Sequence, residues 1–310
     1  MKLRYLGYPC TNVTLGATTG RTLRLANLKE PRLSAVIREN LATLRRLLLW
    51  NVERGIRFFR VASSVIPLAS HEAFPLDWPV QFAPELAEVR ALVAEHHLRL
   101  SMHPGQYTIL NAQRPEVVAA AVRELEYHAA FLAATDPRSG TMTLHVGGAY
   151  GDKGSAKRRF AENAALLSPE ARSRLILEND DRTFHAGDVL ELCEALQLPM
   201  VFDFLHHKLN PVSESWEAEL VPLLARAVAT WDASSLAAKV PKFHLSSPRD
   251  LSTAHADFVE PVDFLQVTDA LAQFGGDAPF DLMLEAKQKD AALLRLLRAP
   301  ELRGVISAAH

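Results

Sequence analysis

The sequence predicts an α/β protein built as a single (β/α)8 barrel of the TIM type. Short β-prone runs alternate along the chain with longer segments of helical periodicity, a pattern that favours a parallel sheet with helical crossovers. There are eight such runs, the number that closes a barrel. The 310 residues contain no Gly/Ser-rich linker. We therefore expect one domain over residues 1–298 and a weakly packed C-terminal tail over 299–310.

The predicted strands are short apolar runs followed by turn or polar residues. In chain order they cover Leu3–Pro9, Ile56–Ser63, Leu98–Pro104, Thr141–Gly147, Arg174–Asp180, Pro199–Phe204, Lys242–Ser247 and Phe280–Lys287. Amphipathic segments separate them, and proline near the start of several fits the first turn of a helix. The predicted helices cover Pro31–Arg54, Pro84–His97, Pro115–Ala134, Ala156–Leu167, Ala186–Leu196, Ser215–Thr230, Pro261–Phe274 and Asp290–Arg298.

The composition, 48% hydrophobic and 23% charged, is typical of a globular protein. No run is long enough to span a membrane and the N-terminus lacks a signal-peptide pattern, so we expect a cytoplasmic monomer without membrane association or an organic cofactor. The two cysteines, Cys10 and Cys193, have no metal-site spacing. A net charge of -2 gives no general attraction for nucleic acid, so an anionic partner must be attracted locally.

Each predicted strand ends in a polar residue, and in a barrel these ends meet at one mouth, where barrel enzymes keep their active sites. The eight residues are Tyr8, Arg60, His103, His145, Glu178, Asp203, His244 and Glu285. His206 follows Asp203 by three positions. One histidine alone is usually structural, but imidazoles and carboxylates gathered at one mouth suit Mn²⁺, Zn²⁺ or Fe²⁺. We predict a cluster of two or three divalent ions there.

Two further histidines lie just past strands and are weaker candidates: His71 in "PLASHEAF" and His255 in "TAHADF". The others occur in helical or terminal contexts that ordinary packing or exposure explains. They are His96, His97, His128, His185, His207 and His310.

Lys242 precedes His244 by two positions in one strand, so both side chains are expected to point into the barrel. A buried lysine must be paired, deprotonated or modified. Three alternatives stay open at this point: an ion pair with Glu285 or Glu178, a cation that stabilises a transition state, or a carboxylated lysine that bridges metals.

Two loops are expected to present polar and aromatic side chains at the mouth, with Tyr8 and Asn12 on the first and Gln106 and Tyr107 on the third. The glycine-rich stretch "VGGAYGDKGSAKRRF" leads into four basic residues, Lys153, Lys157, Arg158 and Arg159. It lacks the P-loop spacing. Either it binds backbone phosphate or it is a solvated helical face.

The ordered motifs "GYPCTN", "RTLRL", "ASH", "SMHPGQY", "LHVGGAYGDK", "LEND", "DFLHH", "KFHLSS", "AHAD" and "LEAK" closely resemble the UV damage endonucleases from about Leu6 to Lys287. The resemblance implies a barrel related to endonuclease IV with a manganese-containing cluster. It also implies an enzyme that nicks damaged double-stranded DNA, and hence associates with the nucleoid. The nick lies immediately 5′ to cyclobutane pyrimidine dimers, 6-4 photoproducts and abasic sites, and leaves a 3′-hydroxyl and a 5′-phosphate.

The resemblance assigns roles to individual residues. It implies metal ligands at His71, His103, His145, Glu178, Asp203, His206, His244, His255 and Glu285. It implies an active-site lysine, modified in some members, at Lys242, and damage-probing residues at Gln106, Tyr107, Tyr8 and Asn12. We expect Glu178 to bridge two ions, and His206 and His255 to serve a third near the leaving oxygen. One departure is Gly20, where relatives often carry asparagine.

Two alternatives come from other functional classes. A sugar isomerase or epimerase uses Glu, Asp and His on the strand ends of the same barrel, but has no use for protruding Gln-Tyr and Tyr-Asn loops. A non-catalytic protein that binds damaged DNA would have no use for a complete set of hydrolytic metal ligands.

Overall fold

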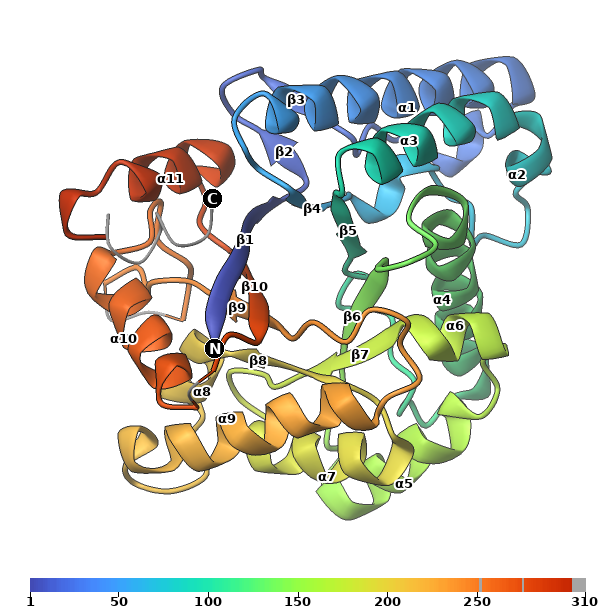
Figure 1. The fold of residues 1–310 in the computed structure, drawn as a ribbon. Coiled ribbons are helices and arrows are strands. Elements are labelled where there is room, and N and C mark those ends of the chain that lie inside the picture. Colours follow the sequence, from blue (N-terminus) through green and yellow to red (C-terminus); the bar gives the residue numbers. More distant parts are fainter. Residues whose placement is uncertain (251–252, 275, 303–310) are drawn as a thin grey trace.

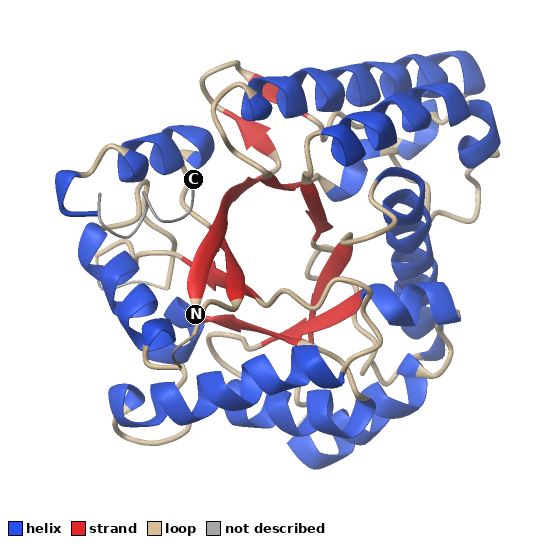
Figure 2. Ribbon diagram, in the orientation of Figure 1, coloured by secondary structure: helices blue, strands red, loops and turns tan. Residues whose placement is uncertain are grey.

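A closed barrel of eight parallel strands forms the centre of the computed structural model, which describes residues 1–250, 253–274 and 276–302 (Figure 1, Figure 2). The barrel strands follow one another in chain order, and β10 closes the ring against β1. Their bounds are β1 (Lys2–Pro9), β4 (Phe58–Arg60), β5 (Arg99–Met102), β6 (Thr141–His145), β7 (Leu175–Glu178), β8 (Met200–Asp203), β9 (Lys242–Leu245) and β10 (Pro279–Leu284). The predicted fold class is confirmed. Most predicted strands were too long, because their last residues leave the sheet to form the mouth.

Helices surround the barrel in the outer ring seen in Figure 2. The long ones are α1 (Glu30–Val52), α3 (Ala83–Glu95), α4 (Pro115–Thr135), α5 (Lys153–Ala164), α7 (Ala186–Leu196), α9 (Trp216–Ala233), α10 (Pro261–Ala272) and α11 (Lys289–Leu297). All match predicted segments within a few residues. Helix α5 begins earlier than predicted because the side chain of Asp152 caps it, accepting hydrogen bonds from Gly154 N and Ser155 N.

Short elements were not predicted, because one or two turns carry too little periodicity to be recognised. They are α2 (Trp78–Gln81), α6 (Pro169–Arg174), α8 (Phe204–Leu209), the 3₁₀ helices η1 (Leu25–Asn27), η2 (Ser63–Val65) and η3 (Pro300–Leu302), and the hairpin of β2 (Thr11–Asn12) and β3 (Ala17–Thr18). Within the tail, Leu302 is fully buried whereas Pro300 and Glu301 are exposed, so its weak packing stays a prediction. Residues 303–310 lie outside the described part, and the domain boundary at 298 stays a prediction.

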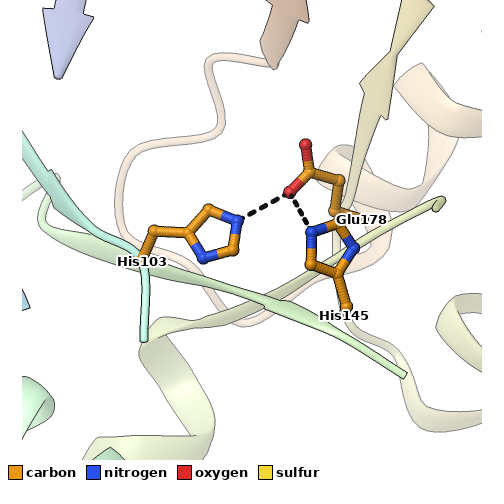
Figure 3. A group of neighbouring side chains, drawn as sticks. All are labelled: His103, His145 and Glu178. Carbon is orange, nitrogen blue, oxygen red and sulfur yellow. Dashed lines mark hydrogen bonds and ion pairs between the residues drawn. The ribbon is translucent and has the colours of Figure 1, made fainter. Parts of the chain in front are cut away.

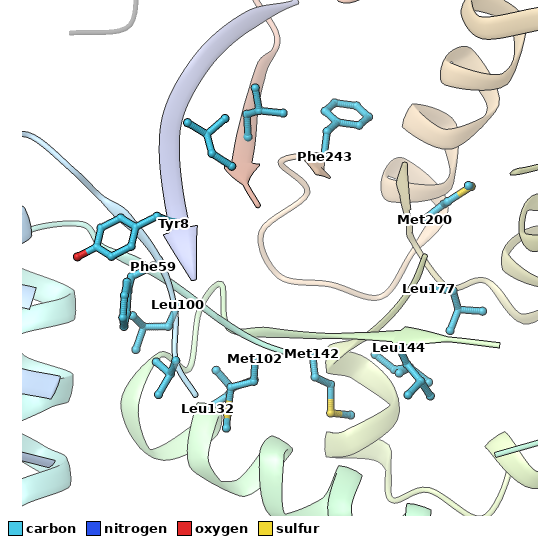
Figure 4. Close-up of a cluster of buried hydrophobic side chains, with 14 of the residues drawn as sticks. Tyr8, Phe59, Leu100, Met102, Leu132, Met142, Leu144, Leu177, Met200 and Phe243 are labelled. Atoms are coloured by element: carbon cyan, nitrogen blue, oxygen red, sulfur yellow. The ribbon is translucent and has the colours of Figure 1, made fainter. Parts of the chain in front are cut away.

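The main hydrophobic core lies between the barrel and its helices. Figure 4 shows side chains of successive strands in this core, among them Phe59, Leu100, Met142 and Leu177. No helix among residues 1–250, 253–274 and 276–302 has the length and hydropathy that crossing a membrane requires.

Polar and charged side chains cross the interior of the barrel. Lys242 of β9 reaches Thr143 of β6, and Arg99 of β5 reaches Asp281 of β10, so both contacts cross the interior between strands that are not neighbours. Asp281 is fully buried and pairs with two cations, Arg99 Nη1 at 2.6 Å and Arg4 Nη2 at 2.5 Å. This ion network lies near the N-terminal ends of the strands.

Replacing Asp281 by Asn should lower the free energy of unfolding by about 3–5 kcal/mol, because the charge of Arg99 would stay buried without its counter-ion. Urea-induced unfolding followed by circular dichroism measures this change. Asp277→Asn is the matched control: Asp277 pairs with Lys2 but its side chain is 82% exposed, so its loss should lower the free energy of unfolding far less than the loss of Asp281. Equal losses in the two variants would contradict the structural role of the buried network.

Candidate metal centre

Three groups of potential metal ligands meet at the C-terminal mouth of the barrel, and Glu178 belongs to all of them. The first contains His103, which directly follows β5, together with His145 and Glu178 at the ends of β6 and β7. Figure 3 shows both imidazoles directed at the same carboxylate oxygen. His103 Nε2 lies 2.9 Å and His145 Nε2 3.4 Å from Glu178 Oε2. A cation at this position would have three donors.

The second group contains Glu178, Asp203 and His206. Asp203 ends β8 and caps α8, and one of its oxygens accepts a hydrogen bond from His206 N at 2.8 Å. The other oxygen, Oδ2, is buried and has no hydrogen-bond partner in the described part of the chain. An unpaired buried carboxylate oxygen is costly unless a cation is supplied.

The third group contains Glu178, His244 and Glu285. His244 Nδ1 lies 2.5 Å from Glu178 Oε1 and 3.2 Å from Glu285 Oε1. Arg60, at the end of β4, pairs with Glu285 and its Nη2 lies 3.0 Å from His244 Nε2. Arg60 was identified from the sequence as a polar residue at a strand end but was not included in the predicted site. Its position at a strand end was the same observation that pointed to the predicted ligands.

Backbone carbonyls orient several of the imidazoles for metal binding. Nδ1 of His103, His206 and His255 lies 3.1, 2.9 and 2.7 Å from the carbonyl oxygens of Pro104, Asn179 and Glu285. Because a carbonyl only accepts, each Nδ1 must carry a hydrogen, which leaves Nε2 as the potential ligand atom. Metal-binding histidines characteristically make such a hydrogen bond with the second nitrogen. The residues present therefore fit divalent ions.

The charges within the centre reinforce this fit. Burial raises the pKa of Asp203 to about 7. Burial opposes the charged form of His206, but Asp203, Glu178 and Glu285 outweigh it and raise its pKa to about 9. Burial also opposes the charge of Glu178, yet His244 and His145 hold its pKa well below the ordinary value. Without metal, the carboxylates of the centre are thus balanced in part by the protonated ring of His206.

The two weaker candidates differ in position. His255 lies at the edge of the centre, with its ring 6.4 Å from that of His206. His71 is exposed, its Nδ1 accepts a hydrogen bond from Ala73 N at 3.0 Å, and it joins none of the three groups. Its role as a ligand stays a prediction.

Lys242 is fully buried below the centre, and its Nζ donates to Thr143 Oγ1 at 2.8 Å. Of the three alternatives for Lys242, the ion pair with Glu285 or Glu178 is not formed among the described residues, and Glu285 pairs with Arg60 instead. Burial, with the nearby charges of Arg60 and Arg99, holds the pKa of Lys242 well below its ordinary value. The neutral form of this amine is therefore favoured beneath the ligands.

The expectation that Tyr8 and Asn12 are exposed at the mouth is wrong. Both are fully buried. Tyr8 Oη donates to Asn51 Oδ1 at 2.7 Å and accepts from Asn12 Nδ2 at 2.9 Å, while Asn12 Oδ1 accepts from Leu15 N at 2.7 Å. These contacts join β1, helix α1 and the β2–β3 hairpin. In this conformation the two residues hold the first loop and present nothing to a ligand.

The third loop agrees with expectation. Gln106 is exposed and Tyr107 is 82% exposed, only four positions after His103. Gly20 in the first loop is closely surrounded, because an added Cβ would lie 3.1 Å from both Ala62 Cβ and Ser64 Oγ. The asparagine expected in relatives would need these neighbours to shift.

Two of the four basic residues after the glycine-rich turn are neutralised within the protein. Lys153 and Lys157 pair with Asp188 of α7, and Lys157 also pairs with Glu191. Arg158 is exposed, whereas Arg159 donates to Asn111 O at 3.1 Å and lies over the Tyr150 ring. Of the four, Arg158 is the one whose charge is best placed for a phosphate.

His207 has a structural role, as expected for most of the helical histidines. It is fully buried, and its Nε2 lies 3.1 Å from Trp216 O. Burial lowers its pKa, so the ring is neutral.

The metal-free protein should lose stability as the pH rises from about 4 to about 9. Asp203 and His206 both have folded-state pKa values, about 7 and about 9, above their values in the unfolded chain. The folded state therefore binds more protons, and its advantage is lost as they dissociate. Thermal unfolding in EDTA across this range measures the effect. Asp203→Asn should remove most of the slope, and so should saturating Mn²⁺; unchanged slopes in both would contradict the assignment.

Comparison with known proteins agrees with these features. The family model described as UV-endonuclease UvdE matches residues 4–309. The chain is 38% identical over 281 residues to the UV DNA damage endonuclease of Bacillus velezensis, covering 89% of this chain and 85% of that protein. It is 31% identical to the UV DNA damage endonuclease of Clostridium perfringens, covering 95% and 70% of the two chains.

Solved structures show the same relationship. SacUVDE superposes with a TM-score of 0.87 at 32% identity, covering 97% of this chain and 99% of that one. Endonuclease IV from Thermus thermophilus superposes with a TM-score of 0.60 at 14% identity, covering 99% and 100%, which shows a shared fold. The barrel carries candidate metal-binding residues at its mouth, and these matches extend over nearly the whole chain. The chain therefore belongs to the UV damage endonuclease family.

Proposed function

We propose that this chain is a metal-dependent endonuclease that nicks duplex DNA immediately 5′ to UV photoproducts and abasic sites, leaving a 3′-hydroxyl and a 5′-phosphate. The observation that carries the proposal is that the exposed Tyr107 lies only four residues after His103, one of the candidate metal ligands. The chain belongs to this family, and its three groups of candidate ligands share Glu178. The proposed ligands are His103, His145, Glu178, Asp203, His206, His244, His255 and Glu285, with His71 the least supported.

Divalent ions, with Mn²⁺ proposed and Zn²⁺ the alternative, would supply an activated water and neutralise the charge of the phosphate when bound. The protein contributes the positions of the donors. His103, His145 and Glu178 sit on neighbouring strands, and carbonyl hydrogen bonds fix the imidazole rings of His103 and His206. The proposed catalytic residues are Glu178, His206 and Lys242.

Lesion recognition is proposed to depend on the ease with which damaged DNA is unstacked. A dimer or an abasic site lowers the cost of extruding a nucleotide by a few kcal/mol. Gln106 and the ring of Tyr107 project from a tight turn and are available to fill the gap that the extruded nucleotides leave. Arg158 is available to bind a backbone phosphate, which would position the duplex without reading its sequence.

A sugar epimerase is the weaker alternative. D-psicose 3-epimerase superposes with a TM-score of 0.53 at 12% identity, a likeness that extends to the fold alone. A free sugar would also make no use of an aromatic side chain that is 82% exposed on a loop at the mouth. A duplex substrate accounts for both the ligands and the loop.

Incubation with Mn²⁺ and a duplex carrying a single pyrimidine dimer should give one cut directly 5′ to the dimer, with a 3′-hydroxyl that a polymerase can extend. Gel mapping against a sequence ladder locates the cut. His206→Ala should keep lesion binding but lose nicking by about 10²-fold or more, because it removes one proposed ligand. Binding without any cleavage by the native chain would instead support a damage-binding protein, and turnover of free sugars alone an epimerase.

Tyr107→Ala should weaken binding to a lesion duplex by about tenfold, corresponding to the loss of one base-stacking contact. Binding to single-stranded DNA should change little, because a single strand leaves no gap to fill. Fluorescence anisotropy with the two substrates measures the difference. Val80→Ala removes another exposed apolar side chain, 71% exposed on the outer helix α2, and should affect neither substrate. Equal loss of affinity by Tyr107→Ala on both substrates would contradict the proposed role of Tyr107 in filling the gap.

A further inference from the structure

A cavity of about 460 Å³ lies at the N-terminal ends of the barrel strands, opposite the candidate metal centre. Its wall is formed by Arg4 and Tyr5 of β1, by the second half of α3, and by the segments 97–98 and 136–139 that lead into β5 and β6. The volume is within the range of pockets that bind small molecules. Within the described part of the chain, none of the candidate metal ligands belongs to this wall. The cavity is therefore separate from the metal centre.

The wall of the cavity carries more positive charge than it neutralises. Asp136 is the one acidic residue among the described residues that line it. This carboxylate is 2% exposed, and its oxygens accept hydrogen bonds from Leu100 N at 2.9 Å and Ser139 N at 3.0 Å. It therefore serves the backbone rather than the cations of the wall, which are Arg4, Arg90 and Arg138.

Arg4 shares its counter-ion with a second arginine. Its Nε and Nη2 donate to the carboxylate of Asp281 at 2.8 and 2.5 Å, and Arg99 Nη1 donates to the same carboxylate at 2.6 Å. Arg99 is 1% exposed, and its Nε and Nη2 have no hydrogen-bond partner within residues 1–250, 253–274 and 276–302. Two guanidinium groups thus depend on one carboxylate. An anion in the cavity, beside the partly exposed Arg4, would balance the excess charge.

Arg90 and Arg138 supply two further cationic groups. Arg90 Nε and Nη2 donate to the carbonyl oxygens of Ala134 and Ala133 at 2.8 and 2.9 Å, in the last turn of α4. These bonds orient the guanidinium group but give it no carboxylate partner. Arg138 is exposed and forms no hydrogen bond or ion pair with the rest of the described chain. Its charge is available to a ligand.

The chemistry of the wall favours an anion that has an apolar part. Arginine binds phosphate oxygens in pairs, and three arginines from separate elements suit a dianion with several oxygens better than a single carboxylate. Beside these cations, the wall contains apolar side chains and one aromatic ring, those of Tyr5, Val93, Ala94, Leu98 and Pro137. A flat organic group attached to the phosphate would bury its surface against them.

We propose that this cavity binds a nucleoside monophosphate, with the phosphate among Arg4, Arg90 and Arg138 and the base against the apolar wall. The chain as a whole has a net charge of -2, so the attraction for this ligand comes from the local excess of arginine. The inference concerns the end of the barrel away from the candidate ligands. It does not depend on the proposed endonuclease function.

Isothermal titration calorimetry of the full chain tests the inference with four probes: adenosine monophosphate, adenosine, ribose 5-phosphate and inorganic phosphate. Adenosine monophosphate should bind with a dissociation constant of about 1 mM or less. Each other probe lacks the base, the phosphate or the nucleoside and should bind at least about tenfold more weakly. The metal-free chain and the Mn²⁺-loaded chain, freed of excess Mn²⁺, should give the same affinity, because the cavity lies away from the candidate ligands.

Arg138→Gln should weaken the binding of adenosine monophosphate by about tenfold, as expected for the loss of one charge-assisted hydrogen bond. Arg138→Lys keeps the charge and should restore part of the affinity. The matched control is Arg46→Gln on α1, because Arg46 is also exposed and without a contact in the described chain but does not line the cavity. It should leave the affinity unchanged. Circular dichroism establishes that each variant is folded.

Four results would overturn the inference. They are no binding of adenosine monophosphate, equal binding of any of the other three probes, binding by the Mn²⁺-loaded chain alone, and an affinity that Arg138→Gln leaves unchanged. None of these results bears on cleavage of damaged DNA, so the proposed function would stand. Conversely, loss of cleavage by a variant of the candidate metal ligands would leave the proposed nucleotide site standing.

Discussion

The buried carboxylate of Glu178 is the constraint on which the functional end of this barrel depends. It is 1% exposed at the end of β7, and its two oxygens serve three groups of ligands. Removing such a charge from water costs several kcal/mol unless cations or donors surround it. His103, His145 and His244 approach its oxygens from three other strands. The histidines around the mouth thus offset the cost of burying this carboxylate.

The alternation of side chains along each strand decides which residues take part in this centre. Successive side chains point to opposite faces, so a one-residue change of register exchanges the inside and outside of the barrel. In β1 the pairing with β10 is irregular between Leu3 and Tyr5. Beyond that point Gly7 aligns with Met283 and Phe58, while Tyr8 aligns with Phe59 and packs against it. Tyr8 therefore faces helix α1, and Gly7 leaves room for Phe58, which an added Cβ would approach to 2.7 Å.

The sequence was sufficient for the features that depend on local pattern. Apolar runs and strand-end residues predicted the eight strands and the convergence of His103, His145, Glu178, Asp203, His244 and Glu285. The errors in the site involve side chains whose partners lie on other elements. The register shift in β1 turns the side chain of Tyr8 away from the barrel interior. Asp188 and Glu191 of helix α7 pair with Lys153 and Lys157 and neutralise their charges. Likewise, Thr143 rather than a carboxylate met Lys242. No periodicity in one segment encodes such pairings.

The loop that follows β5 links the candidate metal centre to the exposed side chains that are proposed to contact DNA. Its far end is tied to the turn after β6, because Asn111 Nδ2 donates to Gly148 O at 2.8 Å and Arg159 donates to Asn111 O at 3.1 Å. Gly147, at φ 108°, is required there, since a Cβ would lie 2.4 Å from Asn111 Oδ1. The loop is therefore anchored at both ends, through His103 and through the turn that follows His145.

This double attachment has a geometric consequence for the proposed reaction. Tyr107 lies only four residues after His103, and Asn111 holds the other end of the loop. The distance between an extruded base and the phosphate at the ligands is then set by the length of this loop. A fixed distance of this kind would place the cut at a constant position beside the lesion, whatever the chemistry of the damaged base.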